Sequence, residues 1–178
     1  MKILYGIQGT GNGHISKSET IYPLLKKYGE VDVLISASNY SLTPSFPVKF
    51  KMKGISFSIS KGKISYWSTL RNIDLVTFLN DINSVPFNTY DLVVSDFEPV
   101  TAWGAKKHGV KSLQISHQAA FRSIKSPRPF IINPLAELVM KYFAPTNYYI
   151  CLHFKKYSKN ISEPIIKKSI FNLKTKIK

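Results

Sequence analysis

Hydrophobic and polar positions along the chain alternate between short apolar runs and amphipathic stretches. The apolar runs predict β-strands at Ile3–Gly6, Val31–Ser36, Asp91–Ser95, Lys111–Ser116 and Tyr148–Leu152. Apolar residues at helical spacing predict helices at His14–Tyr28, Tyr66–Ile82, Pro99–His108 and Leu135–Phe143. Shorter alternating patterns at Val48–Met52 and Ile55–Ile59 are consistent with two further strands.

Strands that are apolar throughout and separated by helices are typical of a parallel sheet covered on both faces. We therefore expect an α/β fold, a Rossmann-like parallel sheet with helices on both faces. Ligands of such sheets bind beyond the carboxyl ends of the strands. Three segments should meet at that edge: Gln8–His14, Asp96–Pro99 and His117–Phe121.

The chain changes character near its end. No internal repeat or low-complexity linker divides residues 1–153, whereas Lys155–Lys178 carries eight lysines against one acid, Glu163. We expect one Rossmann-like domain over residues 1–154. Residues 155–178 are expected to be a lysine-rich connector or the start of a further unit.

Composition narrows the class of protein. A chain of 178 residues with 44% hydrophobic content has the size and apolar content of an ordinary folded domain. The single cysteine, Cys151, excludes an internal disulfide framework and fits a reducing compartment. Residues 1–20 lack the features of a signal peptide, and no apolar run approaches the roughly 18 residues that span a bilayer. We expect a cytoplasmic protein.

The formal net charge of +15 favours anionic partners, such as phospholipid headgroups or a phosphorylated substrate. A solvated, lysine-rich surface without a specific partner is an equally simple explanation. We expect no nucleic-acid partner, because no motif that interleaves aromatic and basic residues is present.

The stretch QGTGNGH, Gln8–His14, lies between the first predicted strand and the first helix. Glycines in such a turn allow the main chain to approach a ligand, and the helix start favours anions. The dinucleotide fingerprint is disfavoured because His14 stands at the third glycine position and the second strand ends without an acid. The phosphate-binding loop of P-loop proteins is excluded because no lysine follows the glycines.

His14 therefore follows three glycines at the expected ligand edge of the sheet. A neutral imidazole beside an anion site can act as a general base. The alternative is a histidine that caps the helix or hydrogen-bonds the turn.

Two further loops supply polar side chains. Asp96 could orient a histidine or bind a sugar hydroxyl, and Glu98 stands at the start of the next helix. For either acid, capping that helix is an equally weighted alternative. His117 and Gln118 follow a later strand and are flanked by small alanines, which leave space for a ligand. The alternative for this pair is a polar loop that satisfies its own main chain.

With these motifs, the sequence resembles glycosyltransferases of the GT-B fold, in particular the N-terminal half of the MurG-like group. QGTGNGHISKS is similar to the first glycine loop of that family. DLVVSDFEPVTAWGAKKHGVKSLQISHQ is similar to its later strand–loop–helix–strand segment, with His117 and Gln118 at the position of a His-Glu-Gln-Asn run. The sequence departs from the pattern in the extra residue Asn12 and in SDFEP, which replaces a second glycine-rich loop.

The resemblance implies an inverting transfer of a sugar from a nucleotide-sugar donor to an acceptor glycan or a lipid-linked sugar. It implies that His14 removes the acceptor proton, with Asp96 as the second candidate for the base or the orienting group. Acceptor phosphate or sugar would be bound by Gly9, Thr10, Gly11, Asn12, Gly13, Glu98, His117 and Gln118. No cofactor or metal is expected, and the basic surface suggests a peripheral position at the inner face of an anionic membrane.

The GT-B fold needs a second domain for the donor. We expect that domain either to follow in a longer enzyme, of which this chain is a fragment, or to be a separate subunit. Two other functions stay open: a non-catalytic module that binds an anionic ligand, and half of a nucleotide-sugar epimerase of the GT-B type.

Overall fold

The structure of the protein is a computed structural model. It describes residues 1–37, 39–56, 58–60, 63–64, 66–123, 125–127, 130 and 133–166. None of the helices in these ranges has the length and apolar character needed to cross a membrane.

Seven parallel strands in the described ranges form one sheet, in the order β3-β2-β1-β6-β7-β8-β9. The strands are β1 (Lys2–Gln8), β2 (Glu30–Ser36), β3 (Phe50–Met52), β6 (Leu92–Asp96), β7 (Ser112–Ser116), β8 (Tyr148–Leu152) and β9 (Ile161–Ser162). The helices are α1 (Asn12–Leu25), α2 (Tyr66–Arg71), α3 (Leu75–Asn83), α4 (Pro99–His108) and α5 (Pro134–Tyr142), with 3-10 turns η1 (Phe87–Thr89) and η2 (Gln118–Arg122). The predicted Rossmann-like α/β fold is confirmed.

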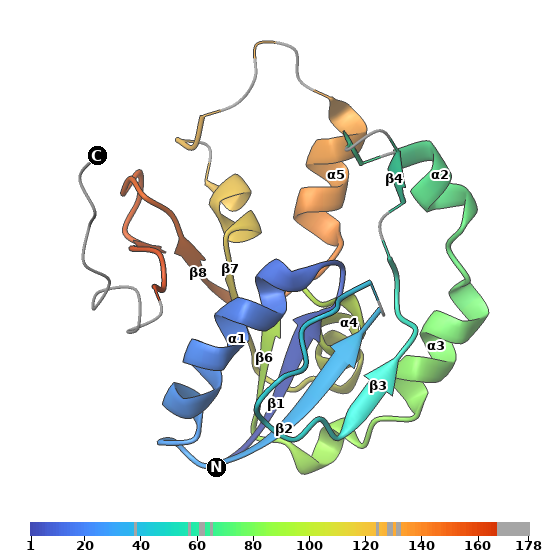
Figure 1. The fold of residues 1–178 in the computed structure, drawn as a ribbon, viewed down its shortest axis with the longest axis vertical. Coiled ribbons are helices and arrows are strands. Elements are labelled where there is room, and N and C mark those ends of the chain that lie inside the picture. Colours follow the sequence, from blue (N-terminus) through green and yellow to red (C-terminus); the bar gives the residue numbers. More distant parts are fainter. Residues whose placement is uncertain are drawn as a thin grey trace.

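Helices cover both faces of the sheet (Figure 1). On one face, Ile15 and Ile21 of α1 pack against Tyr5 and Val33. On the other face, residues of α3, η1 and α4 pack against Leu4 and other side chains of the central strands. Because the central parts of β1, β2 and β6 are buried on both faces, they are formed by apolar runs such as Val33–Ile35 rather than by alternating residues.

The order of the strands defines where a ligand can bind. From β1 the chain moves outward to β2 and β3, and then crosses back to β6 on the other side of β1. The connections after β1 and β6 therefore run to opposite sides, and in sheets of this kind ligands bind in a crevice expected at this point of the carboxyl edge. Ile7 pairs with Asp96 in the register, so the glycine loop and the Asp96 loop both start at this crevice.

Two predicted elements differ from the structure. The helix predicted at Tyr66–Ile82 is two helices, because Asp74 caps α3 by accepting a hydrogen bond from the Thr77 N–H at 3.0 Å. The strand predicted at Ile55–Ile59 is largely absent: of its described residues only Ile59 is in a strand. There β4 (Ile59–Ser60) pairs antiparallel with β5 (Lys63–Ile64), while Phe57 lies outside the described residues.

The segment after Phe154 contributes one strand to the same sheet. Ile161 is buried and pairs with Cys151 of β8. Residues 167–178, which contain most of the lysines of the expected connector, lie outside the described residues. The domain boundary at residue 154 stays a prediction.

Candidate active site

The glycine loop is held by main-chain hydrogen bonds to the segment that follows β2. The Gly9 N–H donates to the Ser36 carbonyl at 2.6 Å, and the Gly11 N–H donates to the Asn39 carbonyl at 3.0 Å. A Cβ at Gly9 would lie 2.7 Å from the Ser36 oxygen, so only glycine allows this close approach. Gly11 has a φ of 92° and is the N-cap of α1. Both residues serve the turn, and their N–H groups are already bonded within the chain.

The other residues of the loop either form hydrogen bonds that hold the loop in place or border open space. Thr10 accepts a hydrogen bond from Gln8 Nε2 at 2.8 Å. Asn12 accepts hydrogen bonds from the main-chain N–H groups of Ser41 and Leu42, and therefore ties α1 to the segment after β2. Beside Gly13 there is open space where a side chain would stand. Gly11 borders open space in the same way, so the loop is open at both glycines that flank Asn12.

The two residues predicted to be catalytic lie together. His14, in the first turn of α1, has its Nδ1 atom 3.0 Å from Oδ2 of Asp96, which ends β6. The Asp96 side chain is fully buried, whereas that of His14 is 15% exposed. The contact has the distance of an ion pair without the alignment of a hydrogen bond. Gly11 caps α1 without a side chain, so His14 does not fill that role.

A third side chain completes this cluster. Lys17 Nζ lies 2.5 Å from Oδ1 of Asp96, and the Lys17 side chain is only 8% exposed. Burial by itself would raise the pKa of Asp96, but the charges of His14 and Lys17 and their contacts outweigh it and hold that pKa below its usual value. Asp96 is therefore a buried carboxylate with a different partner on each oxygen.

The main chain after Asp96 is strained. Phe97 has a φ of 55°, a left-handed conformation that costs a bulky residue free energy. Its buried ring packs against Phe143 in a tilted arrangement with 4.9 Å between the ring centroids, and it also packs against Ala102 and Ala144. This packing holds Phe97 in place, and with it the direction in which Asp96 leaves the strand.

For Glu98, the structure agrees with the alternative prediction that this residue caps the helix that follows it, α4. Its carboxylate is fully buried and accepts hydrogen bonds from the N–H groups of Val100 at 2.8 Å and Thr101 at 2.6 Å at the start of α4. Burial raises the pKa of Glu98, although these hydrogen bonds oppose the rise. No part of this side chain reaches the crevice.

His117 lies just beyond β7 and has a defined tautomer. Its Nδ1 atom is 2.6 Å from the Leu152 carbonyl oxygen, which can only accept, so Nδ1 carries the proton. Burial lowers the pKa of His117, and the positive charge of Lys17 lowers it further. The neutral ring thus has an unprotonated Nε2. Within the described residues, the neighbouring Gln118 has a buried Oε1 without a hydrogen-bond partner.

Neither Gln8 nor Lys17 was predicted from the sequence to be a site residue. Gln8 is buried, donates to the Ile55 carbonyl at 2.9 Å and accepts from Ser36 Oγ, so it links the ends of β1 and β2. Lys17 could have been found from its spacing, because residues three apart on a helix share a face and His14 is three positions earlier. For Gln8 the sequence contains no such signal.

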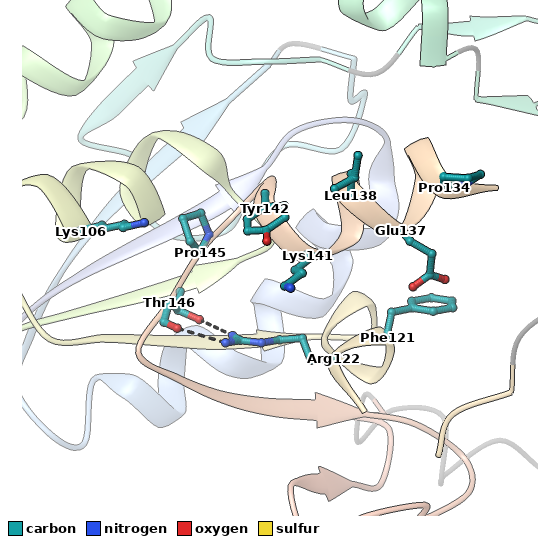
Figure 2. A pocket seen from close by; sticks show the side chains of 10 residues that line it. All are labelled: Lys106, Phe121, Arg122, Pro134, Glu137, Leu138, Lys141, Tyr142, Pro145 and Thr146. Carbon is teal, nitrogen blue, oxygen red and sulfur yellow. Dashed lines mark hydrogen bonds between the residues drawn. The ribbon is translucent and has the colours of Figure 1, made fainter. Parts of the chain in front are cut away.

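The structure also contains a pocket that the sequence did not predict. Its volume is about 870 Å³, and it lies between α4, η2 and α5 (Figure 2). None of the predicted site residues lines it. In the described part of the chain, no group of three or more His, Cys, Asp or Glu side chains is placed to hold a metal ion.

Comparison with protein families identifies the family of the chain. The family model described as glycosyl transferase family 1 matches residues 1–177. The chain belongs to this family. Membership in glycosyl transferase family 1 confirms the resemblance to GT-B glycosyltransferases that the sequence motifs suggested. No curated protein matches the chain significantly.

Solved structures show weak likeness to this member of glycosyl transferase family 1. A UDP-N-acetylglucosamine 2-epimerase has a TM-score of 0.47 and 15% identity, over 85% of this chain and 41% of its own. SsfS6 from Streptomyces sp. SF2575, a glycosyltransferase, has a TM-score of 0.46 and 14% identity, over 92% and 53%. MurG from Acinetobacter baumannii has a TM-score of 0.44 and 11% identity, over 93% and 44%. The chain therefore spans about half the length of these proteins.

Proposed function

We propose that this chain is the acceptor-binding half of an inverting glycosyltransferase in which His14 is the general base and Asp96 orients it. The observation that carries the proposal is the distance of 3.0 Å between His14 Nδ1 and the buried Asp96 Oδ2. The pair lies at the crevice between β1 and β6, where parallel sheets bind their ligands. A contact that is not aligned in the free protein can become aligned when substrate binds.

In the proposed reaction, Asp96 holds the proton of His14 on Nδ1, so that Nε2 is the basic atom. Nε2 removes the proton from the acceptor hydroxyl as its oxygen bonds to the anomeric carbon of the donor sugar. The bond between that carbon and the phosphate oxygen breaks on the opposite side, and the nucleoside diphosphate leaves with the electron pair. The anomeric configuration is inverted, and the proton ends on His14.

The substrates follow from this assignment. The acceptor, a glycan or a lipid-linked sugar, would lie in the space beside Gly13, next to His14. His117 and Gln118 are candidate contacts on the β7 side, because the unprotonated Nε2 and the unpartnered Oε1 can accept hydrogen bonds from sugar hydroxyls. The nucleotide-sugar donor would be held by a second unit, since the described residues form only one Rossmann-like sheet.

The net charge of +15 supports a further part of the proposal, a peripheral position on an anionic membrane at its cytoplasmic face. Binding of the chain to vesicles with and without anionic lipid measures this. Equal binding to both would contradict it.

Substitution of His14 tests the proposed function. In the enzyme complete with its donor-binding unit, we expect His14→Ala to lower kcat by about 100-fold or more, because general base catalysis contributes that much. The dissociation constant of the acceptor should change little. His108→Gln, a change at an exposed histidine of α4, is the matched control. A His14→Ala enzyme with normal kcat and weak acceptor binding would instead show a binding module.

A further inference from the structure

Helix α5 is packed on one side and open on the other. Val139, Met140 and Phe143 pack against the cluster around Phe97. Leu138 and Tyr142, four positions apart and thus on one face of the helix, are 54% and 51% exposed. The lining of the pocket on this open side includes Pro134, Glu137, Leu138, Lys141 and Tyr142.

The opposite walls come from two other elements. Phe121 and Arg122 of η2 form one wall, and Lys106 in the last turn of α4 forms another. The pocket is open on one side, and its volume of about 870 Å³ is in the range of sites for drug-sized molecules. A smaller pocket of about 200 Å³ adjoins it through the shared residues Lys106, Pro145 and Thr146. The hollow is therefore large enough for a small organic ligand.

The guanidinium group of Arg122 is held in place by its neighbours. Its guanidinium donates to Thr146 Oγ1 at 3.0 Å and to the Thr146 carbonyl at 3.3 Å, and it lies 4.5 Å from the centre of the Tyr149 ring. Partial burial lowers the pKa of Arg122. Thr146 is neutral, and a guanidinium has five N–H donors, so donors are left for a further acceptor. Figure 2 shows these hydrogen bonds at the edge of the pocket.

Lys141 and Lys106 add two positive charges to the lining. Their ammonium groups lie 5.1 Å from the ring of Tyr142 and 5.0 Å from the ring of Trp103. Among the described residues, none of the ion pairs involves Arg122, Lys141 or Lys106. In Figure 2 these cations lie toward the Thr146 end of the pocket, whereas Phe121 and Glu137 lie toward the other end. One end of the pocket is therefore cationic, and the other end has the Phe121 ring and the Glu137 carboxylate.

We propose that this pocket binds a small amphipathic anion, with a carboxylate or phosphate on Arg122 and Lys141 and an apolar body against Leu138, Tyr142 and Phe121. Bidentate contact with a guanidinium and a neighbouring ammonium is a strong arrangement for either anion. The proposal does not depend on the reaction at His14, because none of the residues around that histidine lines the pocket.

Electrostatic repulsion makes it unfavourable for this chain itself, as a second copy or through its own C-terminal segment, to occupy the pocket. A second copy would bring another net charge of +15 to a surface that already has three cations. The end of the chain is equally unsuitable, because residues 167–178 contain five lysines and no acid. An anionic ligand both neutralises the cations and covers the apolar face of α5.

Octyl phosphate below its critical micelle concentration is a suitable probe, with binding to the 178-residue chain followed by calorimetry and by amide NMR shifts. We expect octyl phosphate to bind at least about tenfold more tightly than inorganic phosphate or neutral 1,2-octanediol, since each lacks one half of the interaction. The shifted amides should belong to η2 and α5.

Variants locate the site. Arg122→Gln and Lys141→Gln should each weaken octyl phosphate binding about tenfold, the usual effect of losing a hydrogen bond to a charged group. Leu138→Asn should weaken it as well. Lys27→Gln, which removes an exposed lysine after α1, is the matched control and should leave binding unchanged.

Three results would overturn the proposal: unchanged binding in both charge variants, equal affinity for 1,2-octanediol, or equal affinity for inorganic phosphate. If Arg122→Gln does not fold, Arg122→Lys keeps the charge without the planar fork and should still weaken binding. Because no glycosyl transfer is measured, failure here is distinct from failure of the proposed function.

Discussion

At the scale of single residues, the centre of the candidate site is Asp96, which is fully buried between Lys17 and His14. A buried carboxylate needs partners for both oxygens, and the two residues come from one face of α1, three positions apart. Lys17 therefore compensates the charge of Asp96 and leaves the second oxygen to orient His14. A lysine in this role makes the site a triad rather than a pair.

The contribution of Lys17 can be measured as stability. Lys17→Met should lower the free energy of unfolding by about 3 kcal/mol, because it leaves a buried carboxylate with one partner fewer. The double variant Lys17→Met/Asp96→Asn should recover part of this loss in urea unfolding. Lys53→Met is the control, since the side chains of Lys53 and its partner Asp74 are 67% and 41% exposed and such pairs contribute little.

The same experiment has a pH dependence. Because the pKa of Asp96 is held below its ordinary value of 3.8, its ion pairs stabilise the fold above that pH. This stability is lost as pH falls through the lowered pKa. The difference between the unsubstituted protein and Lys17→Met should shrink accordingly in acid, and a difference independent of pH would contradict the assignment.

The sequence predicted which residues would meet at the site, but it did not predict the hydrogen bonds of the glycine loop. His14 and Asp96 were predicted to meet because loops after neighbouring parallel strands share an edge, and they lie 3.0 Å apart. The N–H groups of Gly9 and Gly11 were expected to face an acceptor. They bond instead to Ser36 and Asn39, residues distant in sequence whose approach no local pattern reveals.

At the scale of elements, the turn from β6 into α4 fixes the site. Asp96 contacts His14, Phe97 takes a strained conformation, and Glu98 caps α4. The central strands could be predicted from their apolar runs, and α4 from Pro99 at its first position. The break before α3 could not, because Asp74 ends one helical pattern and starts another within a continuous amphipathic stretch.

Substitution of Glu98 tests the structural role of this turn. Glu98→Ala should destabilise the protein by about 2 kcal/mol, the upper range for an N-cap. Glu98→Gln should cost less, because its amide oxygen can still accept and the raised pKa shows that the charge is not favoured there. Thermal unfolding measures both. Lost acceptor binding in a Glu98→Gln protein of unchanged stability would support the ligand-binding alternative.

At the scale of the whole molecule, the described residues form one Rossmann-like sheet, and the chain covers about half of each compared structure. The family could be predicted because the first glycine loop and the later strand–loop–helix–strand segment that ends in His117 and Gln118 resemble those of the family, although Asn12 and SDFEP depart from its pattern. The pocket beside α5 could not, because its walls come from three elements whose separation depends on packing.

The proposed division, with the acceptor bound by this chain and the donor bound by a second unit, predicts the activity of this chain alone. The purified 178-residue chain should show no glycosyl transfer by itself, because its described residues contain no second Rossmann-like sheet to hold a donor. Transfer should appear when a donor-binding unit is present. Turnover by the chain alone, measured as release of nucleoside diphosphate that depends on acceptor, would contradict this division.

The most direct test of the central claim is the rate of the complete enzyme with His14→Ala, Asp96→Asn and both changes together. If Asp96 acts through His14, the double variant should be no slower than His14→Ala alone, because residues that act as a unit are not additive. Multiplied losses in the double variant, or a normal kcat in Asp96→Asn, would contradict the account.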